Sequence, residues 1–118
     1  MGGEERIVRH LPLKPIDFHI LLVLTEGDLH GYGIVKEIEG RSDGRIRLEP
    51  GNLYRYIRRL VDEELVEPAD RRPTDDDSER RRYYAVTELG REVLAAEVTR
   101  MRSLVLVAEA RLALTSRS

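Results

Sequence analysis

The chain has 118 residues, of which 36% are charged and only 5% are aromatic, so one domain with a modest and mainly aliphatic core is expected. The absence of cysteine excludes disulfides, thiolate zinc sites and cysteine nucleophiles, and it fits a cytoplasmic location. The formal net charge is −2, which means that any affinity for nucleic acid must come from local cations. No run of about 18 apolar residues is present, so no contact with a membrane is expected.

The first third of the chain predicts a leader and two helices. Residues 1–10 are expected to form a disordered leader, since no apolar signal core of the right kind follows them. Residues 15–25 are apolar almost throughout and begin with Pro15, which suits the first turn of a buried helix. A second helix is expected over residues 31–39, with Gly40 as its stop.

Three short strands are predicted in the rest of the first 90 residues. Apolar residues alternate with arginines between residues 41 and 49, which indicates a short strand before the third helix. Residues 65–69 contain Pro68 and therefore suit only an edge strand. Residues 82–86 are rich in strand formers, and the polar stretch 70–81 is expected to be a mobile hairpin loop between these two strands.

Residues 50–60 predict a helix with two unlike faces. Apolar side chains recur at helical spacing and are expected to pack inward: Leu53, Ile57, Leu60 and Val61. A second side mixes guanidinium groups with an amide and an aromatic ring: Asn52, Arg55, Tyr56 and Arg59. Arginine can bond bidentately to guanine and asparagine to adenine, so this side suits the reading of duplex DNA. The alternative is a solvated basic helix face.

The charge around this helix is polarised. Residues 41 to 59 contain six arginines and two acidic residues, a local charge of +4. The charged residues between positions 62 and 70 are all acidic. Such an arrangement suits a helix that presents its N-terminal half to phosphate and its rear to solvent.

The last predicted helix, over about residues 88–114, begins after Thr87 as its N-cap. Its apolar residues are spaced by four and three positions in alternation: Leu94, Val98, Met101, Val105, Ala108 and Leu112. This spacing is an a/d seam of nearly three heptads, which needs a partner. Self-association into a two-fold dimer is favoured over the alternative, in which the helix folds back onto its own domain.

The fold class that follows is mainly α with a small β wing, a winged helix-turn-helix with an added C-terminal dimerisation helix. Residues 1–10 are the leader, residues 11–87 the DNA-binding domain and residues 88–118 the dimerisation helix. No nucleophile has a matched base, so the chain is not expected to be an enzyme. The histidines are scattered, and neither a metal site nor a cofactor is expected.

Four blocks of the sequence resemble, in order and in spacing, the PadR family of transcriptional regulators. They are EGDLHGYGI at residues 26–34, LEPGNLY at 48–54, RRL at 58–60 and RYYAVTELG at 82–90. Together they cover roughly residues 11–95. The single long C-terminal helix resembles the shorter subgroup of that family.

The resemblance implies a homodimer that binds a roughly palindromic operator on double-stranded DNA, usually as a repressor. It implies that the third helix enters the major groove, that the wing touches the adjacent backbone, and that some members release DNA when a small aromatic or hydrophobic effector binds near the dimer interface. The resemblance places Tyr54 at the DNA, Gly51 where the backbone approaches closely, and residues 30–32 near a phosphate.

The chain departs from the family pattern at several positions. Glu49 stands where serine is usual, and Glu64 replaces a glycine in the turn that follows the third helix. Residues 75–77 are three consecutive aspartates, which make the expected wing tip acidic. The acidic tip favours phosphate contacts at the base of the wing, by Arg80, Arg81 and Arg82, over contacts at the tip itself, whereas Glu64 makes a different geometry of the turn after the third helix possible.

The expected site residues fall into five groups. Base reading is assigned to Asn52, Arg55, Tyr56 and Arg59. Contact with phosphate is assigned to Lys36, Arg58, Arg80, Arg81 and Arg82, and Tyr32, Gly51 and Tyr54 complete the DNA-binding set. The a/d seam forms the dimer interface, and an effector pocket is placed at Phe18, Leu22 and Leu94. The competing interpretation is a winged-helix adaptor that pairs with another protein through its last helix.

Overall fold

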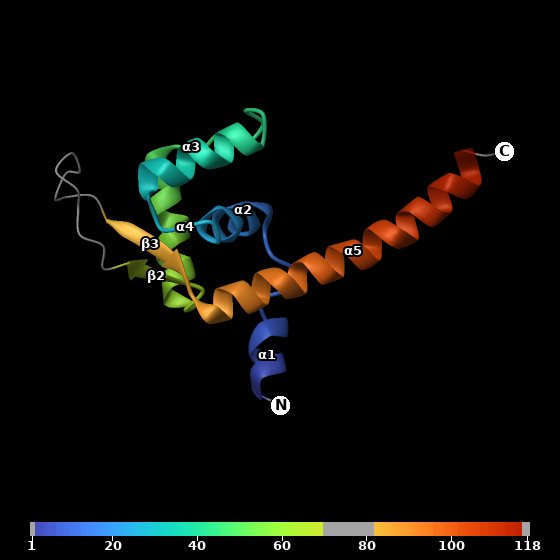
Figure 1. Ribbon diagram of the computed structural model, residues 1–118, viewed down its shortest axis with the longest axis horizontal. Coiled ribbons are helices and arrows are strands. Elements are labelled where there is room, and N and C mark those ends of the chain that lie inside the picture. The colour runs from blue at the N-terminus through green and yellow to red at the C-terminus, as the bar shows by residue number, and fades with distance from the viewer. Residues whose placement is uncertain (1, 70–81, 117–118) are drawn as a thin grey trace.

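The computed structural model describes residues 2–69 and 82–116 as five helices and a small sheet (Figure 1). In chain order the elements are α1 (Gly2–Val8), α2 (Pro15–Leu24), β1 (Leu29–His30), α3 (Gly31–Arg41), α4 (Pro50–Asp62), β2 (Val66–Ala69), β3 (Tyr83–Val86) and α5 (Glu88–Ser116). This order confirms the mainly helical fold with a β wing and a long last helix. The predicted wing loop lies outside the described residues.

The core lies where α2, α3, α4 and the first turns of α5 meet. Pro15 and Pro50 occupy the first turns of α2 and α4, where a missing backbone N–H costs nothing. Apart from Glu97, the largest fully buried side chains are aliphatic: Ile20, Leu21, Leu24, Ile34, Ile38, Leu53, Ile57, Leu60 and Leu65. A core of this composition matches the low aromatic content of the sequence.

The sheet has the order β1-β3-β2, and both pairs of neighbours are antiparallel. The strand expected over residues 41–49 is wrong, because β1 precedes α3 and the chain turns after it. Asp43 and Gly44 have positive φ angles of 54° and 77°, and the backbone N–H of Ile46 donates to Ser42 Oγ at 3.0 Å. This tight turn after α3 prevents an extended conformation there.

Residues 2–8 form a helix instead of the disordered leader expected for residues 1–10. Glu4 and Glu5 lie in the first turn of α1, where the helix dipole favours acidic side chains. Ile7 is half-buried and packs against the core, and α1 contacts α5. Tertiary packing therefore orders a segment whose sequence carries little apolar periodicity.

Glu97 on α5 forms a hydrogen bond with the segment between α1 and α2. Its carboxylate is buried at 2% exposure, accepts two hydrogen bonds from Arg100 at 2.7 and 2.9 Å, and accepts one from the Leu13 backbone N–H at 3.3 Å. The hydrogen bonds from Arg100 are the main reason why the pKa of Glu97 lies below its ordinary value. The carboxylate is therefore charged at neutral pH and holds Leu13 against the helix.

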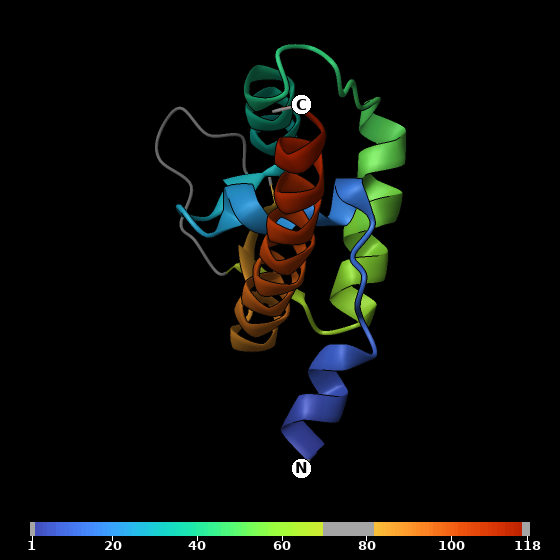
Figure 2. The ribbon, with the colours of Figure 1, turned by 90° about the vertical axis from the view of Figure 1, so that its right-hand side faces the viewer.

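The C-terminal half of α5 projects away from the other elements (Figures 1 and 2). Leu94 is buried in its own domain and Val98 and Met101 are half-buried, whereas Val105, Ala108 and Leu112 are exposed. The predicted a/d seam is thus covered by the chain itself at its start and uncovered farther along. None of the described helices is long and apolar enough to cross a membrane.

The turn after α4 keeps the geometry that a glycine would favour, although Glu64 occupies it. Glu64 has a φ of 65°, its N–H donates to the Val61 carbonyl at 3.0 Å, and the Leu65 N–H donates to the Leu60 carbonyl at 2.9 Å. These two bonds form a Schellman motif. Glu64 therefore adopts the left-handed conformation that a glycine would favour at this position, and the turn forms with both of its hydrogen bonds.

The same turn holds the beginning of α5. The Thr87 N–H donates to the Leu65 carbonyl at 3.1 Å, and the Thr87 hydroxyl donates to the Glu64 carbonyl at 2.6 Å. The Gly90 N–H donates to Thr87 Oγ1 at 2.9 Å, which confirms Thr87 as the N-cap. A Cβ atom at Gly90 would clash with the Leu65 carbonyl oxygen and lie 2.8 Å from a methyl group of Val86.

Two helical glycines should therefore respond in opposite ways to alanine. Gly90→Ala should lower the free energy of unfolding by about 1–3 kcal/mol, because the added methyl group meets backbone atoms that cannot retreat. Gly40→Ala in α3 should raise it by roughly 0.5–1 kcal/mol, since nothing lies within 4 Å of the added atom. Urea denaturation followed by circular dichroism measures both changes. A Gly90→Ala protein as stable as the parent would contradict the close contact.

Candidate nucleic-acid interface

The buried face of α4 is the one that the sequence predicts. Leu53, Ile57 and Leu60 are almost completely buried, and Val61 is half-buried at the edge of the same face. Because this face is held in the core, the opposite side of the helix must face outward.

The outward side near the start of α4 carries Gly51, Asn52 and Arg55, all of which are exposed. Arg55 Nη2 donates to Asn52 Oδ1 at 2.5 Å, so the amide and the guanidinium lie beside each other. Tyr56 is half-buried and packs against the core, which leaves only part of its side chain available. Asn52 and Arg55 are thus the two most accessible of the four residues assigned to base reading.

Tyr54 joins α4 to the beginning of α3. Its side chain is 49% exposed, and its hydroxyl oxygen would lie 2.9 Å from a Cβ atom added at Gly31. A side chain at position 31 would therefore displace the end of the Tyr54 ring. Gly31 thus lets the Tyr54 ring lie directly against the start of α3.

Aromatic and cationic side chains gather at this end of α3. His30 is the N-cap of the helix, and its Nδ1 accepts a hydrogen bond from the Gly33 N–H at 3.1 Å. Its ring stacks on Tyr32 with a centroid separation of 6.4 Å, and Lys36 Nζ lies 5.5 Å from the Tyr32 ring centroid. Tyr32 and Lys36 are both exposed, so this cluster lies open to a partner.

Arg59 lies apart from the exposed pair and contacts α2. Its Nη2 donates to Asp17 Oδ1 at 2.6 Å, and its Nη1 lies 3.7 Å from a carboxylate oxygen of Glu63. Asp17 is buried, and the hydrogen bond to it is the main reason why the pKa of Arg59 is raised above its ordinary value. The structure thus gives Arg59 a role in packing α4 against α2, and the base reading assigned to it stays a prediction.

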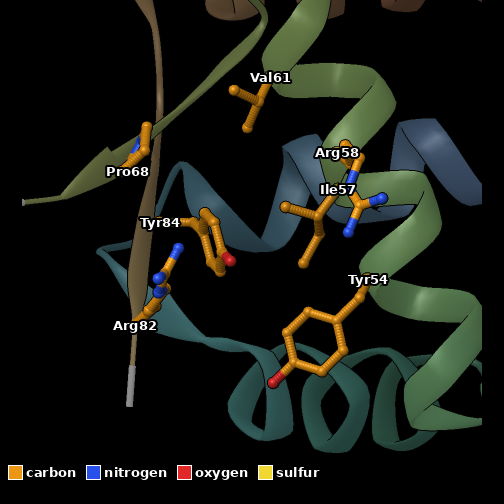
Figure 3. Close-up of a pocket in the computed structure, with 7 residues that line it drawn as sticks. All are labelled: Tyr54, Ile57, Arg58, Val61, Pro68, Arg82 and Tyr84. Carbon is orange, nitrogen blue, oxygen red and sulfur yellow. The ribbon is translucent and has the colours of Figure 1, made fainter. Parts of the chain in front are cut away.

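A cavity of about 450 Å³ lies between α4 and the wing strands (Figure 3). We call it the notch and define it by its lining residues: Tyr54, Ile57, Arg58, Val61, Pro68, Arg82 and Tyr84. It brings together Arg58 and Arg82, which the sequence assigns separately to phosphate contacts. Burial raises the pKa of Tyr84, although Arg82 and Arg58 act in the opposite direction, so its hydroxyl is protonated at neutral pH.

The remaining expected residues do not join this surface. Arg80 and Arg81 lie outside the described residues. Phe18 and Leu22 are half-buried on α2, and Leu94 is buried in the core, away from the residues that line the notch. Sequence reasoning did not assign Pro68 and Tyr84 to a site, because only the pairing of β2 with β3 brings them opposite α4.

Residues 20–96 match the family model described as the transcriptional regulator PadR-like family. The chain belongs to this family. The match covers both helices of the helix-turn-helix, all three strands and the first turns of α5. Membership in a family of PadR-like transcriptional regulators confirms the resemblance seen in the sequence and the expectation that the chain is not an enzyme.

Two curated relatives share the PadR-like region. An uncharacterised protein X of Lysinibacillus sphaericus is 31% identical over 80 residues, which make up 68% of this chain and 72% of that protein. An uncharacterised 37.1 kDa protein in transposon Tn4556 of Streptomyces fradiae is 38% identical over 85 residues, or 72% of this chain. The aligned residues span only 22% of the length of the Streptomyces protein.

Solved structures agree with the PadR-like fold. A PadR family transcription regulator of Clostridium difficile has a TM-score of 0.67 at 26% identity, covering 84% of this chain and 99% of that one. A transcriptional regulator of Clostridium thermocellum has a TM-score of 0.66 at 25% identity, covering 80% and 87%. Bacillus subtilis PadR, solved in complex with operator DNA, has a TM-score of 0.61 at 20% identity, covering 72% and 47%, and this likeness shows the fold alone.

Breaking the contact between α2 and α4 should destabilise this PadR-like domain. Arg59→Gln should lower the free energy of unfolding by about 2 kcal/mol, because it leaves the buried Asp17 carboxylate without a counter-charge. Asp17→Asn should lower it by a similar amount or less, since Arg59 keeps only the more distant carboxylate of Glu63. The double variant should lose less than the sum of the two. Arg55→Gln, an exposed change on the same helix, should stay within about 0.5 kcal/mol of the parent. Urea denaturation of the four variants tests the coupling, and strictly additive losses would contradict it.

Proposed function

We propose that the chain is a sequence-specific DNA-binding repressor of the cytoplasm, acting as a homodimer on a pseudo-palindromic operator. The observation that carries the proposal is the exposed pair of Asn52 and Arg55 at the front of α4, joined by a hydrogen bond and backed by a rigid apolar face. Both side chains can bond to base edges in the major groove, which admits a helix. The helix-turn-helix motif, to which α4 belongs, is known to place its second helix in the major groove of DNA.

Cations around this pair supply the contacts that position a duplex without reading its sequence. Lys36 lies on α3, Arg58 farther along α4 and Arg82 next to β3, and all three are exposed. Contacts to phosphate fix the register and orientation of a protein on DNA. The complex of Bacillus subtilis PadR with operator DNA supports this reading at the level of the fold.

The homodimer is proposed from the uncovered end of α5. Leu104, Val105, Leu106, Val107 and Leu112 are all more than half exposed. Contiguous apolar surface of this kind marks an interaction site. A second copy of α5 would cover the seam from Met101 onward, and a two-fold axis would direct two α4 helices to half-sites about one helical turn, or a multiple, apart.

We also propose that a small hydrophobic or aromatic effector releases the protein from its operator. Phe18 and Leu22 lie one turn apart on α2, are half-buried and belong to a helix that contacts α5. A ligand at a dimer interface would therefore meet these two side chains first. Leu94 would lie behind them, since its own domain buries it.

Replacement of Arg55 tests the reading of bases. Arg55→Ala should weaken binding to a duplex selected from a random pool by about 1–3 kcal/mol and should relax the preference at one base position. Arg9→Ala, which removes an exposed arginine just after α1, should leave affinity and preference unchanged. Fluorescence anisotropy at several salt concentrations gives both quantities, and affinity should fall steeply with salt. A flat salt response would remove DNA binding as the main activity.

A carboxylate introduced on α5 tests the homodimer. Val105→Glu places a carboxylate on the seam and should convert a dimer to a monomer, because a buried charge without a partner is costly. Ser103→Glu, on the opposite side of the same helix turn, should leave the dimer intact. Analytical ultracentrifugation measures the mass of each variant. A parent chain that stays monomeric at every concentration, and pairs only with a different protein, would support the adaptor instead.

A further inference from the structure

Both arginines that line the notch lack an acidic partner among the residues that the structure describes. Arg58 extends from α4 and Arg82 lies beside β3, on opposite walls of the cavity (Figure 3). Within residues 2–69 and 82–116, neither guanidinium forms an ion pair, whereas Arg41, Arg59 and Arg100 each do. Two uncompensated guanidinium groups at one cavity attract an anion that offers several acceptor oxygens.

Tyr84 lies between these arginines and adds a hydrogen-bond donor. Its side chain is 9% exposed, and its hydroxyl points into the notch in Figure 3. Among the described residues this hydroxyl has no hydrogen-bond partner. The ring is largely buried while the hydroxyl opens into the notch, so a molecule bound there can accept its proton, and an anionic oxygen accepts it well.

The rest of the notch is apolar. Ile57 and Val61 from α4 and Pro68 from β2 line it, and the ring of Tyr54 lies at one end (Figure 3). A volume of about 450 Å³ falls in the range of roughly 300–1,000 Å³ that small-molecule sites occupy. The notch therefore offers room and an apolar lining for an organic group beside the two cations.

Charge balance distinguishes among the anions that would fit. A carboxylate or a phosphodiester of DNA carries one negative charge, whereas a phosphomonoester carries about −1.5 to −2 at pH 7. The two guanidinium groups match the phosphomonoester, and the apolar lining matches an attached aromatic or aliphatic group. Neither feature alone would select this ligand class.

We infer that the notch binds a phosphomonoester that carries an apolar or aromatic group, of the class of an aryl phosphate or a nucleoside monophosphate. Arg58 and Arg82 hold the phosphate, Tyr84 donates to it, and the apolar walls pack on the organic group. Since the same two arginines are proposed to contact the DNA backbone, the bound ligand excludes DNA. This last consequence rests on the proposed function.

Isothermal titration calorimetry without DNA tests the site, with phenyl phosphate as the probe. Phenyl phosphate should bind at least about tenfold more tightly than inorganic phosphate, which lacks the ring, or benzoate, which lacks the second charge. Arg58→Gln and Arg82→Gln should each weaken its binding about tenfold, and Tyr84→Phe roughly threefold to fivefold. Arg45→Gln removes an exposed charge between α3 and α4, outside the notch, and should bind like the parent.

Two results would overturn the site. One is equal affinity for phenyl phosphate, inorganic phosphate and benzoate, which would mean that the cations attract any anion. The other is parental affinity in both arginine variants, which would place the ligand elsewhere. Circular dichroism and thermal melting establish that each variant is folded, so a loss of binding reports on the notch itself.

Competition with DNA tests exclusion separately. Phenyl phosphate should release a fluorescent duplex, selected from a random pool, from the parent protein, and benzoate at the same ionic strength should not. Retention of the duplex at saturating phenyl phosphate would overturn exclusion. If no duplex binds in the first place, the DNA-binding proposal fails while the calorimetric result still supports the site, so the two failures are distinguishable.

Discussion

The setting of α4 depends on the ion pair between Asp17 and Arg59. Asp17 is a buried carboxylate in an otherwise apolar helix, and such a group is tolerated in a core only when a cation meets it. Arg59 supplies that cation from the C-terminal half of α4. The contact opposes rotation of α4 about its axis, so Leu53 and Ile57 stay inward and Arg55 outward. The ion pair on the inner side of α4 thus determines which side chains of the helix are exposed.

A second set of contacts carries this orientation into the rest of the chain. The carbonyl groups of Glu64 and Leu65 accept hydrogen bonds from Thr87, and the missing side chain of Gly90 lets α5 begin directly against them. The end of α4 and the start of α5 are thereby joined within a few residues, with β3 leading into the junction. In any dimer formed through α5, the angle and distance between the two α5 helices would therefore determine the distance between the two α4 helices. That distance would in turn determine the spacing of the two half-sites.

Much of the fold could be predicted because local signals coincide with the tertiary structure. Proline begins α2 and α4, Thr87 caps α5, and the apolar period of α4 gives its buried face. The strand β1 could not be found this way, since two residues carry no periodicity and their pairing with β3 is long-range. Arg59 shares a side with Asn52 and Arg55 on a helical projection, and its ion pair with Asp17 could not be predicted because Asp17 lies on another helix. Pairing of distant strands likewise decides that Pro68 and Tyr84 face α4.

The acidic residue at the start of α4 fits the distribution of cations around it. Glu49 is the N-cap, is exposed and makes no capping hydrogen bond through its side chain. Its carboxylate nevertheless lies near the positive end of the helix dipole, where it stabilises the helix and offsets the partial charge that would otherwise attract a phosphate. Attraction for phosphate is therefore weaker at the tip of α4 and stronger at its flanks, where Lys36 and the notch lie. In the proposed complex, Asn52 and Arg55 would therefore contact the bases, and the contacts with the DNA backbone would lie on either side of them.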